Sequence, residues 1–442
     1  MNQQFLCEHL ILLIGGNPVP NAVAGSLLAT RQGTITLVHS CGPGGTGDVA
    51  QRLRSWLMDQ NSGTTVELTE VNESSATSIC ASVRSRLEAV SAASVGLNYT
   101  DGTKAMSAHA YRAVEMWAEE DKDISPIFSY LDARTLQMMF ESDAFGGLTR
   151  CERVGRSIQV KLHDLIKLHG WSLIHEPTRV PVLSATAGAI AKTCSAPGGI
   201  EEWSRWVHKE IRLKCRHTNP ALDDLVTDRK QEIEHSALQV CPVRPRKDEG
   251  WKDNEALRSV LLQLPRAGAL AGVITTLRSE PGVASGSGLN LSYDIFGKDP
   301  RRFCEWLYGK WLEHHVLDVL RTLAGVLEFH ECGQNVEATG VQFDLDVIAM
   351  RGYQLFAISC STDSKKRLLK LKLFEADVRA RQLGGDEARV ALVCCAAEPH
   401  QIEREMQRDL GVKGRICVFG REHLANLSEH LKHWIKTQSR ED

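Results

Sequence analysis

The sequence predicts an α/β protein in which two sheet-containing domains are separated by a mostly helical middle segment. Two observations predict this fold class. Between residues 9 and 117, apolar runs of strand length alternate four times with helical stretches, and each run ends in a polar loop. Towards the C-terminus the order is a long helix, a hairpin, a second helix and a buried strand. The first pattern is typical of a doubly wound parallel sheet, and the second indicates a separate α/β domain.

The strands of the first domain are expected where short apolar runs are rich in β-branched residues. They cover residues 9–14, 34–39, 64–69 and 89–97, and helices follow at residues 21–30, 49–58, 78–88 and 105–117. Because the carboxyl ends of parallel strands share one edge, the loops that follow them should form a common rim where ligands bind. These loops cover residues 15–21, 40–48, 72–77 and 98–104.

The loop at residues 98–104 gives the strongest binding signal in this rim. Asn98, Thr100 and Thr103 offer side-chain donors, and the backbone N–H groups of a turn before a helix favour an anion. Lys104 opens the helix, where its charge opposes the helix dipole unless an anion or a carboxylate lies nearby. The loop is therefore either an ordinary turn with a solvated lysine or a pocket for a phosphate-bearing ligand. No loop matches Gly-x-Gly-x-x-Gly or a Walker A sequence, which argues against ordinary dinucleotide or NTP sites.

Composition limits the classes of protein that the chain can belong to. Its 442 residues are 43% hydrophobic and 24% charged with a formal net charge of −3, which is typical of a globular protein rather than a basic nucleic-acid coat. No apolar run approaches the ~18 residues of a membrane span, and the N-terminus lacks the basic region of a secretory signal. The 13 cysteines are odd in number and include no Cys-x-x-Cys pair. We therefore expect a cytoplasmic protein with reduced thiols and no membrane partner.

Three motifs of the first domain together resemble a CARF domain, a Rossmann-like sensor of cyclic oligoadenylates in type III CRISPR systems. They are Gly-Gly-Asn-Pro-x-Pro-Asn at residues 15–21, Val-His-Ser at residues 38–40 with Thr46, and Asn-Tyr-Thr-x-Gly-Thr-Lys-Ala-Met at residues 98–106. The resemblance covers residues 1–145. It implies a homodimer that holds a two-fold-symmetric ring across the subunit interface, with cyclic tetraadenylate as the expected ring. It also implies a set of ligand-binding residues: Gly16, Asn17, Pro18, Ser40, Thr46, Asn98, Thr100, Gly102, Thr103 and Lys104.

Residues 146–298 are expected to form a basic, mostly helical linker domain. Basic and apolar residues recur at helical spacing, with tryptophans among them, so these helices either line a nucleic-acid surface or pack with their charged faces in solvent. Gly, Ser and Ala are concentrated in two further stretches, which predict flexible connections. The basic stretches are residues 149–168, 200–215 and 244–247, and the flexible ones are residues 184–191 and 281–288.

The second α/β domain is expected at residues 299–442. Its order of elements resembles the core of the PD-(D/E)xK nuclease fold. The sequences around Glu313 and Asp346 resemble the nuclease half of CARF-fused CRISPR nucleases, over residues 300–420. The helix is expected at residues 299–327, the hairpin at residues 337–350 and 353–360, the second helix at residues 366–382 and the buried strand at residues 388–396.

This resemblance implies a metal-dependent nuclease site. Glu313 on the long helix and Asp346 on the hairpin match the carboxylates that hold Mg²⁺ or Mn²⁺, because these cations prefer oxygen ligands. The Glu-x-Lys pair that should end the hairpin is replaced by Ser359-Cys360-Ser361. Either Lys365 or Lys366 takes over from the missing lysine, with Asp363 or Glu375 as a replacement carboxylate, or the domain is a degenerate nuclease.

Three functions follow as hypotheses. The first is a nuclease that a cyclic oligoadenylate activates and that degrades DNA or RNA in type III CRISPR antiviral defence. The second is a catalytically silent receptor of the same ring, which signals through a partner. The third is a ring nuclease that degrades its own activator in the N-terminal pocket. Cleavage assays with and without cyclic tetraadenylate distinguish all three.

Overall fold

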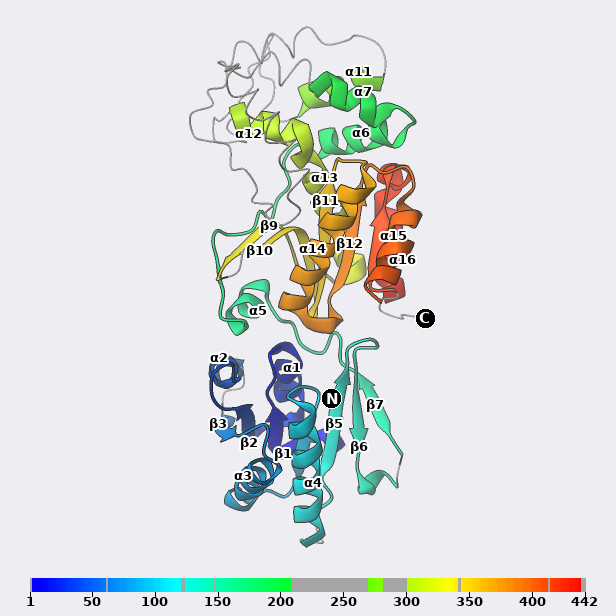
Figure 1. Cartoon of the computed structure of the whole chain (residues 1–442). Helices are drawn as coiled ribbons and strands as arrows, with labels where there is room; N and C mark the ends of the chain where they lie inside the picture. The colour runs from blue at the N-terminus through cyan, green and yellow to red at the C-terminus, as the bar shows by residue number, and fades with distance from the viewer. Residues whose placement is uncertain are drawn as a thin grey trace.

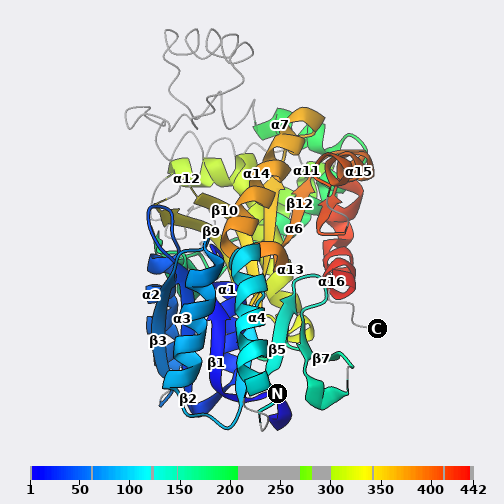
Figure 2. The same cartoon turned by 60° about the horizontal axis from the view of Figure 1, so that its bottom comes forward.

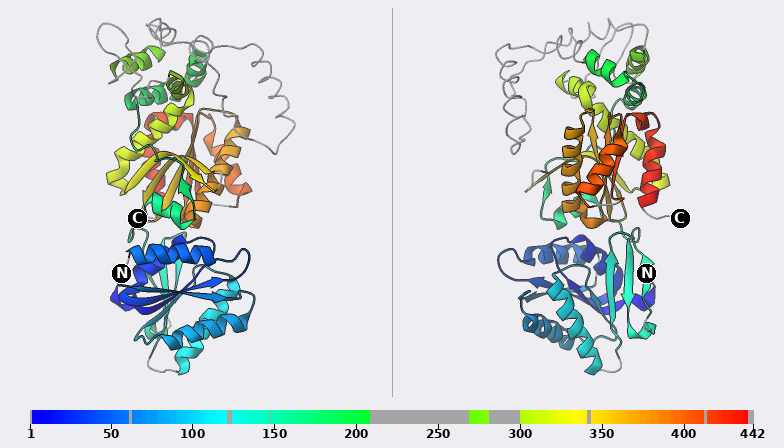
Figure 3. Two further views of the ribbon diagram at one scale, coloured as in Figure 1. Left: turned by 90° about the vertical axis from the view of Figure 1, so that its left-hand side faces the viewer. Right: turned by 45° about the vertical axis from the view of Figure 1, so that its right-hand side comes forward.

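The structure is a computed structural model of the chain. Two sheet domains are stacked end to end, and helices from the middle of the chain lie at the far end of the second domain (Figure 1). Views from two other directions show the same two lobes (Figure 3). The structure describes residues 2–60, 63–120, 124–146, 148–207, 269–280, 300–340, 343–411 and 414–438.

The first domain is built on a seven-stranded sheet with the order β3-β2-β1-β4-β5-β6-β7. The first four strands in sequence are parallel, as predicted. β5, where the sequence predicts no strand, is also parallel, and β6 and β7 extend that edge in antiparallel fashion. The strands are β1 (Cys7–Leu13), β2 (Ala29–Ser40), β3 (Thr65–Val71), β4 (Val95–Asn98), β5 (Ile127–Asp132), β6 (Gln137–Glu141) and β7 (Arg150–Arg153). The helices are α1 (Val19–Leu28), α2 (Gly47–Gln60), α3 (Ala76–Ala89) and α4 (Lys104–Glu120).

Helices cover both faces of this sheet (Figure 2). Leu10 and Leu12 of β1 belong to the core that contains α1 and α2, whereas Ile11 and Leu13 belong to the core that contains α3 and α4. A strand that is buried on both faces reads as a continuous apolar run, which explains why the sequence predicts β1 well. The carboxyl ends of the parallel strands lie at the edge that faces the second domain (Figure 1).

The middle segment is shared between the two sheets rather than set apart from them. β7 lies beyond the predicted end of the first domain, and β8 (Ser172–Leu173) pairs with the second sheet. The helices are α5 (Leu162–Leu168), α6 (Ser184–Ser195), α7 (Gly199–Trp206) and α11 (Ala269–Ser279). α6, α7 and α11 share one hydrophobic core with the second domain.

Two predictions for the middle segment are wrong. Residues 149–168 are not one helix, because β7 occupies their first part and only α5 is helical. Residues 184–191 are not a flexible connection but the start of α6, whose small side chains Ala187 and Ala191 are buried against neighbouring helices. The predictions at residues 208–215, 244–247 and 281–288 lie outside the described residues.

The second domain is built on a six-stranded sheet with the order β13-β12-β11-β10-β9-β8. The predicted hairpin is confirmed as β10 and β11, although the stretch predicted as one strand at residues 337–350 is divided between β9 and β10. The strands are β9 (Glu331–Thr339), β10 (Phe343–Arg351), β11 (Gln354–Ser361), β12 (Arg389–Cys394) and β13 (Ile416–Phe419). The helices are α12 (Pro300–Glu305), α13 (Trp311–Leu327), α14 (Lys366–Gly384), α15 (Pro399–Asp409) and α16 (Leu427–Gln438).

Helices also cover both faces of the second sheet. α13 and α16 share a core with one face, and α14 and α15 share a core with the other. A π-helical turn, η5 (Trp306–Lys310), joins α12 to α13, and 3-10 turns η6 (Gly385–Glu387) and η7 (Arg421–Asn426) follow α14 and β13. Among the described residues, no helix has the length and apolar character that a membrane crossing requires.

Candidate functional site

Two predicted ligand residues, Asn98 and Thr100, hold the end of β4 against β5. Asn98 is completely buried, and its Nδ2 donates to Ser129 Oγ at 3.0 Å. Its Oδ1 accepts hydrogen bonds from the backbone N–H and the hydroxyl of Thr100, at 3.2 and 2.7 Å. Thr100 Oγ1 in turn accepts the N–H of Leu131 at 2.8 Å. These polar atoms are engaged within the protein, so the structure gives the two residues a role in shaping the loop.

Ser40 and Thr46 close the second loop of the rim. The backbone N–H of Ser40 donates to Thr46 Oγ1, and the backbone N–H of Thr46 donates to Ser40 Oγ, both at 3.0 Å. Thr46 Oγ1 also donates to the carbonyl oxygen of Ile14 at 3.0 Å. The two hydroxyls therefore fix loop 41–45 next to the end of β1.

Asp101, which no sequence motif singles out, lies between the first and last loops of the rim. Its carboxylate accepts the N–H of Gly15 at 3.1 Å, and any side chain at Gly15 would collide with it. Burial raises the pKa of Asp101 to about 6, although hydrogen bonds from the Gly102 and Gly15 backbones oppose the shift. This carboxylate therefore occupies a backbone N–H of loop 15–21, one of the loops that the sequence places in the ligand-binding rim. Only the tertiary approach of the two loops reveals it.

The remaining predicted residues lie at the surface of the rim or at helix starts. Thr103 Oγ1 accepts the N–H of Met106 at 3.1 Å and so caps α4. Gly16 and Lys104 are exposed, and no described residue forms a hydrogen bond or ion pair with the Lys104 ammonium. Asn17 Oδ1 accepts the N–H of Val19 at 3.1 Å, next to the buried Pro18. Gly102 has a φ of +82°, which favours glycine at this turn.

Asn17 also brings the rim into contact with the second domain. A Cβ added to Gly385, at the end of α14, would collide with the side-chain amide of Asn17. The neighbouring Glu387 is buried, and this loss of hydration, together with Asp386 and Asp101, raises its pKa to about 7. The predicted ligand loop therefore lies directly against the turn that follows α14.

Glu313, the first predicted metal ligand, lies in the first turn of α13, directly after the π-helical turn η5. π-helical turns are frequent at functional sites. Loss of hydration and the nearby Asp346 raise the pKa of the Glu313 carboxyl well above its usual range, whereas Lys310 and Lys372 oppose the shift. No described residue donates a hydrogen bond to this carboxyl group. It therefore lies in a site that disfavours negative charge unless a cation is supplied.

Asp346, the second predicted ligand, lies in the opening between β10 and β11, which is the place beyond Val347 and Ile358 where the two strands no longer pair. The antiparallel pairing ends at Val347 with Ile358. Beyond this pair, Asp346 Oδ2 accepts the backbone N–H of Cys360 at 2.7 Å and the hydroxyl of Ser359 at 2.9 Å. Its other oxygen accepts no hydrogen bond from the described part of the chain. Ser359, which stands in place of the missing Glu, therefore orients Asp346.

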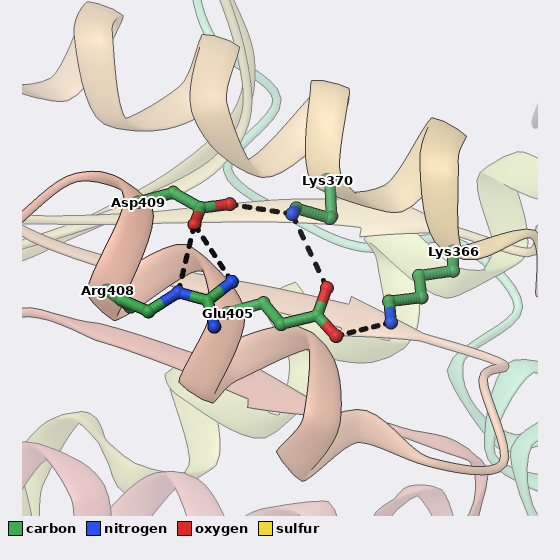
Figure 4. Close-up of polar contacts among 5 residues, drawn as sticks. All are labelled: Lys366, Lys370, Glu405, Arg408 and Asp409. Carbon is green, nitrogen blue, oxygen red and sulfur yellow. Dashed lines mark hydrogen bonds and ion pairs between the residues drawn. The ribbon is translucent and has the colours of Figure 1, made fainter.

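The two lysines predicted to act in this site differ in their surroundings. Lys366 Nζ forms an ion pair with Glu405 of α15, and Lys370 joins the same network through Glu405 and Asp409 (Figure 4). Lys365 is exposed, and its backbone N–H donates to Asp363 Oδ1 at 2.7 Å. Of the alternative carboxylates, Asp363 is used in this turn and Glu375 forms an ion pair with Arg379.

A different lysine, Lys372, reaches the opening between β10 and β11. Its Nζ donates to the carbonyl oxygen of Cys360 at 3.0 Å. Its charge lowers the pKa of both Glu313 and Asp344, which burial otherwise raises. Sequence reasoning missed Lys372 because it lies eleven residues beyond Ser361 and meets the strand only through the packing of α14.

The donor set at this site fits a hard divalent cation. Glu313, Asp346 and Asp344 supply only oxygen atoms, and their mutual repulsion raises the pKa of Glu313 and Asp344. His400, Glu422 and His423 form another group of suitable ligand types. His423 Nδ1, however, accepts the N–H of Gly420 at 3.0 Å, so the proton of a neutral ring lies on Nε2 and blocks the atom that faces Glu422. The carboxylate site is therefore the better candidate.

Comparisons with known proteins match one segment of the chain by sequence and almost the whole chain by fold. Residues 298–438 match the family model described as the Card1-like endonuclease domain. Protein VC1899 from Vibrio cholerae has a similar fold, with a TM-score of 0.63, 16% identity, and coverage of 97% of this chain and 98% of that one. Can2 from Sulfobacillus thermosulfidooxidans, solved in complex with cyclic tetra-adenylate, also has a TM-score of 0.63, with 14% identity and coverage of 97% and 99%.

No curated protein matches the chain in sequence. The structural similarities extend over almost the whole chain and support the fold, including the N-terminal domain. The resemblance to CARF-fused nucleases is thus confirmed by the family of the second domain and by the fold of the whole chain. Residues 298–438 therefore match the Card1-like endonuclease domain, within a chain whose fold is similar to that of Can2.

Proposed function

We propose that the protein is a nuclease that a cyclic oligoadenylate activates and that requires Mg²⁺ or Mn²⁺. One observation carries the proposal: Glu313 and Asp346 lie together, as the resemblance implies, inside the Card1-like endonuclease domain. When bound, a divalent cation would act as a Lewis acid on the scissile phosphodiester. The proposed role in type III CRISPR defence is supported by the resemblance of the motifs at residues 15–21, 38–46 and 98–106 to those of CARF domains.

The protein's own residues would prepare this site for nucleic acid. Glu313 and Asp346 would hold the cation, and Ser359 and the Cys360 N–H would keep the Asp346 carboxylate in place. A lysine would offset the negative charge that develops on the phosphate during cleavage. Lys365 and Lys366 are the candidates from the sequence, and Lys372 is the candidate from the geometry.

The first domain would bind the activator, with cyclic tetraadenylate as the proposed ring. Gly16, Asn17 and Lys104 present donors and charge at the rim, and Can2, which shares the fold, was solved with this ring. A ring with its own two-fold axis can make the same contacts with two subunits, so a homodimer is the simplest assembly.

Two alternatives depend on the altered Glu-x-Lys motif. Ser359 and Ser361 cannot replace a carboxylate and a lysine directly, so a silent receptor that signals through a partner is the second candidate. A ring nuclease, which would cut its activator at the first domain, is the third.

Cleavage assays with the full chain test these proposals. Labelled plasmid DNA, single-stranded DNA, RNA and cyclic tetraadenylate are each incubated with Mg²⁺, Mn²⁺ or EDTA, with and without the ring as activator. We expect ring-stimulated cleavage of DNA or RNA that EDTA abolishes and that Asp346→Ala reduces at least ~100-fold. Ring binding without any cleavage would identify a receptor, and ring cleavage that Asp346→Ala leaves unchanged would identify a ring nuclease.

A further inference from the structure

The end of β11 lacks the expected lysine, but the ammonium group of a lysine from α14 is hydrogen-bonded to its backbone. Cys360 presents two backbone groups to the opening between β10 and β11. Its N–H donates to Asp346 Oδ2 at 2.7 Å, and its carbonyl oxygen accepts from Lys372 Nζ at 3.0 Å. A metal-ligand candidate and a cation are thus fixed to the same residue of the strand.

The helical geometry of α14 explains why Lys372 alone, among three neighbouring lysines, faces this opening. Leu369 and Leu373 are buried against the sheet, so Lys372 lies beside the buried stripe of the helix. Lys366 and Lys370 are four residues apart and share another face, where both pair with Glu405 (Figure 4). Residues two apart on a helix point in nearly opposite directions, which separates Lys370 from Lys372.

The charge of Lys372 also acts on both sides of the opening. It lowers the pKa of Glu313, which lies on α13, and of Asp344, which lies on β10. Lys310 also lowers the pKa of Glu313, from the turn before α13. Lys372 therefore lies close to carboxylates from both elements.

We propose that Lys372 is the catalytic lysine of this domain, having replaced from α14 the lysine that β11 has lost. The inference rests on the proposed nuclease function. The reaction would be hydrolysis of a phosphodiester: a water oxygen bonds to phosphorus while the bond to the leaving oxygen breaks. One water proton passes to the leaving oxygen and the other to the phosphate monoester or solvent. Lys372 would donate a charge-assisted hydrogen bond to a phosphate oxygen as negative charge develops there.

The test compares Lys372→Met with the matched control Lys370→Met on the same helix, in the full chain with cyclic tetraadenylate. Lys372→Met should lower the single-turnover cleavage rate at least ~100-fold and change nucleic-acid affinity only slightly. Lys370→Met should keep the parent rate. In the absence of nucleic acid, Lys372→Met should also bind Mn²⁺ more tightly, by about threefold to tenfold, because a nearby cation has been removed.

A rescue experiment distinguishes catalysis from mere support of the fold. Ser361→Lys returns a lysine to the strand, so the double variant Lys372→Met/Ser361→Lys should recover a substantial part of the cleavage rate. The proposal would be overturned if Lys372→Met kept the parental cleavage rate. It would also be overturned if Lys310→Met, Lys365→Met or Lys366→Met lost the cleavage rate while Lys372→Met kept it. Unchanged Mn²⁺ affinity in Lys372→Met would also contradict it. If the parent cuts no nucleic acid, the proposed function fails first, and the catalytic role of Lys372 fails with it.

Discussion

Lys104 differs from the other predicted ligand residues because its charged group remains at the surface of the rim. Asn98 is buried, and the Asn98 and Thr100 side chains hydrogen-bond to the protein itself. Lys104 is exposed at the first residue of α4, where a positive charge is unfavourable beside the helix dipole. An anionic ligand would remove this penalty, so Lys104 should contribute to binding directly.

We expect Lys104→Ala to weaken the binding of cyclic tetraadenylate. The loss should be at least the ~1.5 kcal/mol of a charge-assisted hydrogen bond, or about tenfold in affinity. Isothermal titration calorimetry at fixed salt concentration measures it. Arg112→Ala is the matched control, because it removes an exposed cation from the same helix two turns away and should leave the affinity unchanged. Equal affinities for Lys104→Ala and the parent would exclude Lys104 from the ligand site.

At the residue scale, the sequence identifies candidate ligand loops and metal-binding carboxylates, but it predicts few of the individual contacts that these residues make. Asp346 is recognisable from its position in a strand motif, and the structure places it beside Glu313. Asp101 and Lys372 are not recognisable, because each meets its partner through contacts between segments distant in sequence. Asn98 matches the motif by residue type, but the sequence does not predict that it is buried, because its burial depends on the packing of β5 beside it.

At the element scale, α14 connects the two candidate sites. Its first half carries Lys372, and its end at Gly385 touches Asn17 of the predicted ligand loop. A helix of 19 residues spans about 28 Å, and it is stiff over that length. A change in the loop that moves the end of α14 would therefore be transmitted towards Lys372.

Gly385→Ala should disturb this contact. Gly385 has φ and ψ of +67° and −158°, a region that is essentially restricted to glycine and costs other residues about 1–3 kcal/mol. A Cβ would also collide with Asn17 and lie 2.7 Å from Glu387 Oε2. We therefore expect a lower free energy of unfolding and weaker stimulation of cleavage by the ring, measured by urea denaturation and by activator titration.

Gly411→Ala provides the control for backbone strain. Gly411 has a φ of +65°, but a Cβ there would meet nothing within 4 Å. Gly411→Ala should lower the free energy of unfolding by about 1 kcal/mol, the cost of a left-handed conformation for a residue other than glycine. The ring should stimulate cleavage by this variant as much as it stimulates the parent. Equal stimulation in Gly385→Ala and Gly411→Ala would show that the Asn17 contact does not transmit the signal.

The sequence predicts elements well where periodicity and length agree. The strands β1, β2 and β3 of the first sheet and the hairpin of the second are examples, because burial of alternate or all side chains leaves a clear pattern. α6 is missed because Ser, Ala and Gly resemble a flexible connection, yet small side chains also allow helices to approach closely. β9 is missed as a separate strand because the turn at Gly340, with a φ of +92°, lies within a continuous strand-like pattern.

At the scale of the whole molecule, the proposed homodimer predicts the stoichiometry of ring binding. Because each subunit of a two-fold dimer would contribute one rim to a shared ring, titration should saturate at one cyclic tetraadenylate per two chains. Calorimetry gives the ratio, and light scattering gives the mass of the complex. One ring per chain on a monomer would contradict the shared site.

The contact between the two domains contains carboxyl groups from both sides. Asp101 of the first domain and Glu387 of the second are both removed from water, and Asp101 adds to the raised pKa of Glu387. Asp386, Arg389 and Tyr353 also lie close to Glu387, and the Arg389 cation partly opposes the shift. The interface is therefore most favourable when Glu387 holds a proton.

The stability of the chain should consequently decrease as pH rises from about 4.5 to about 7. Folded Glu387 keeps its proton up to a pKa of about 7, whereas the unfolded chain releases it near the ordinary value of 4.5. Within this range the folded state binds more protons, so each increase in pH favours unfolding, and the loss is complete above pH 7. The Glu387→Gln variant has no ionisable group at this position. The difference between its urea midpoint and that of the parent should therefore increase from pH 5 to pH 8. Glu429→Gln, which alters an exposed glutamate of α16, should show no such trend.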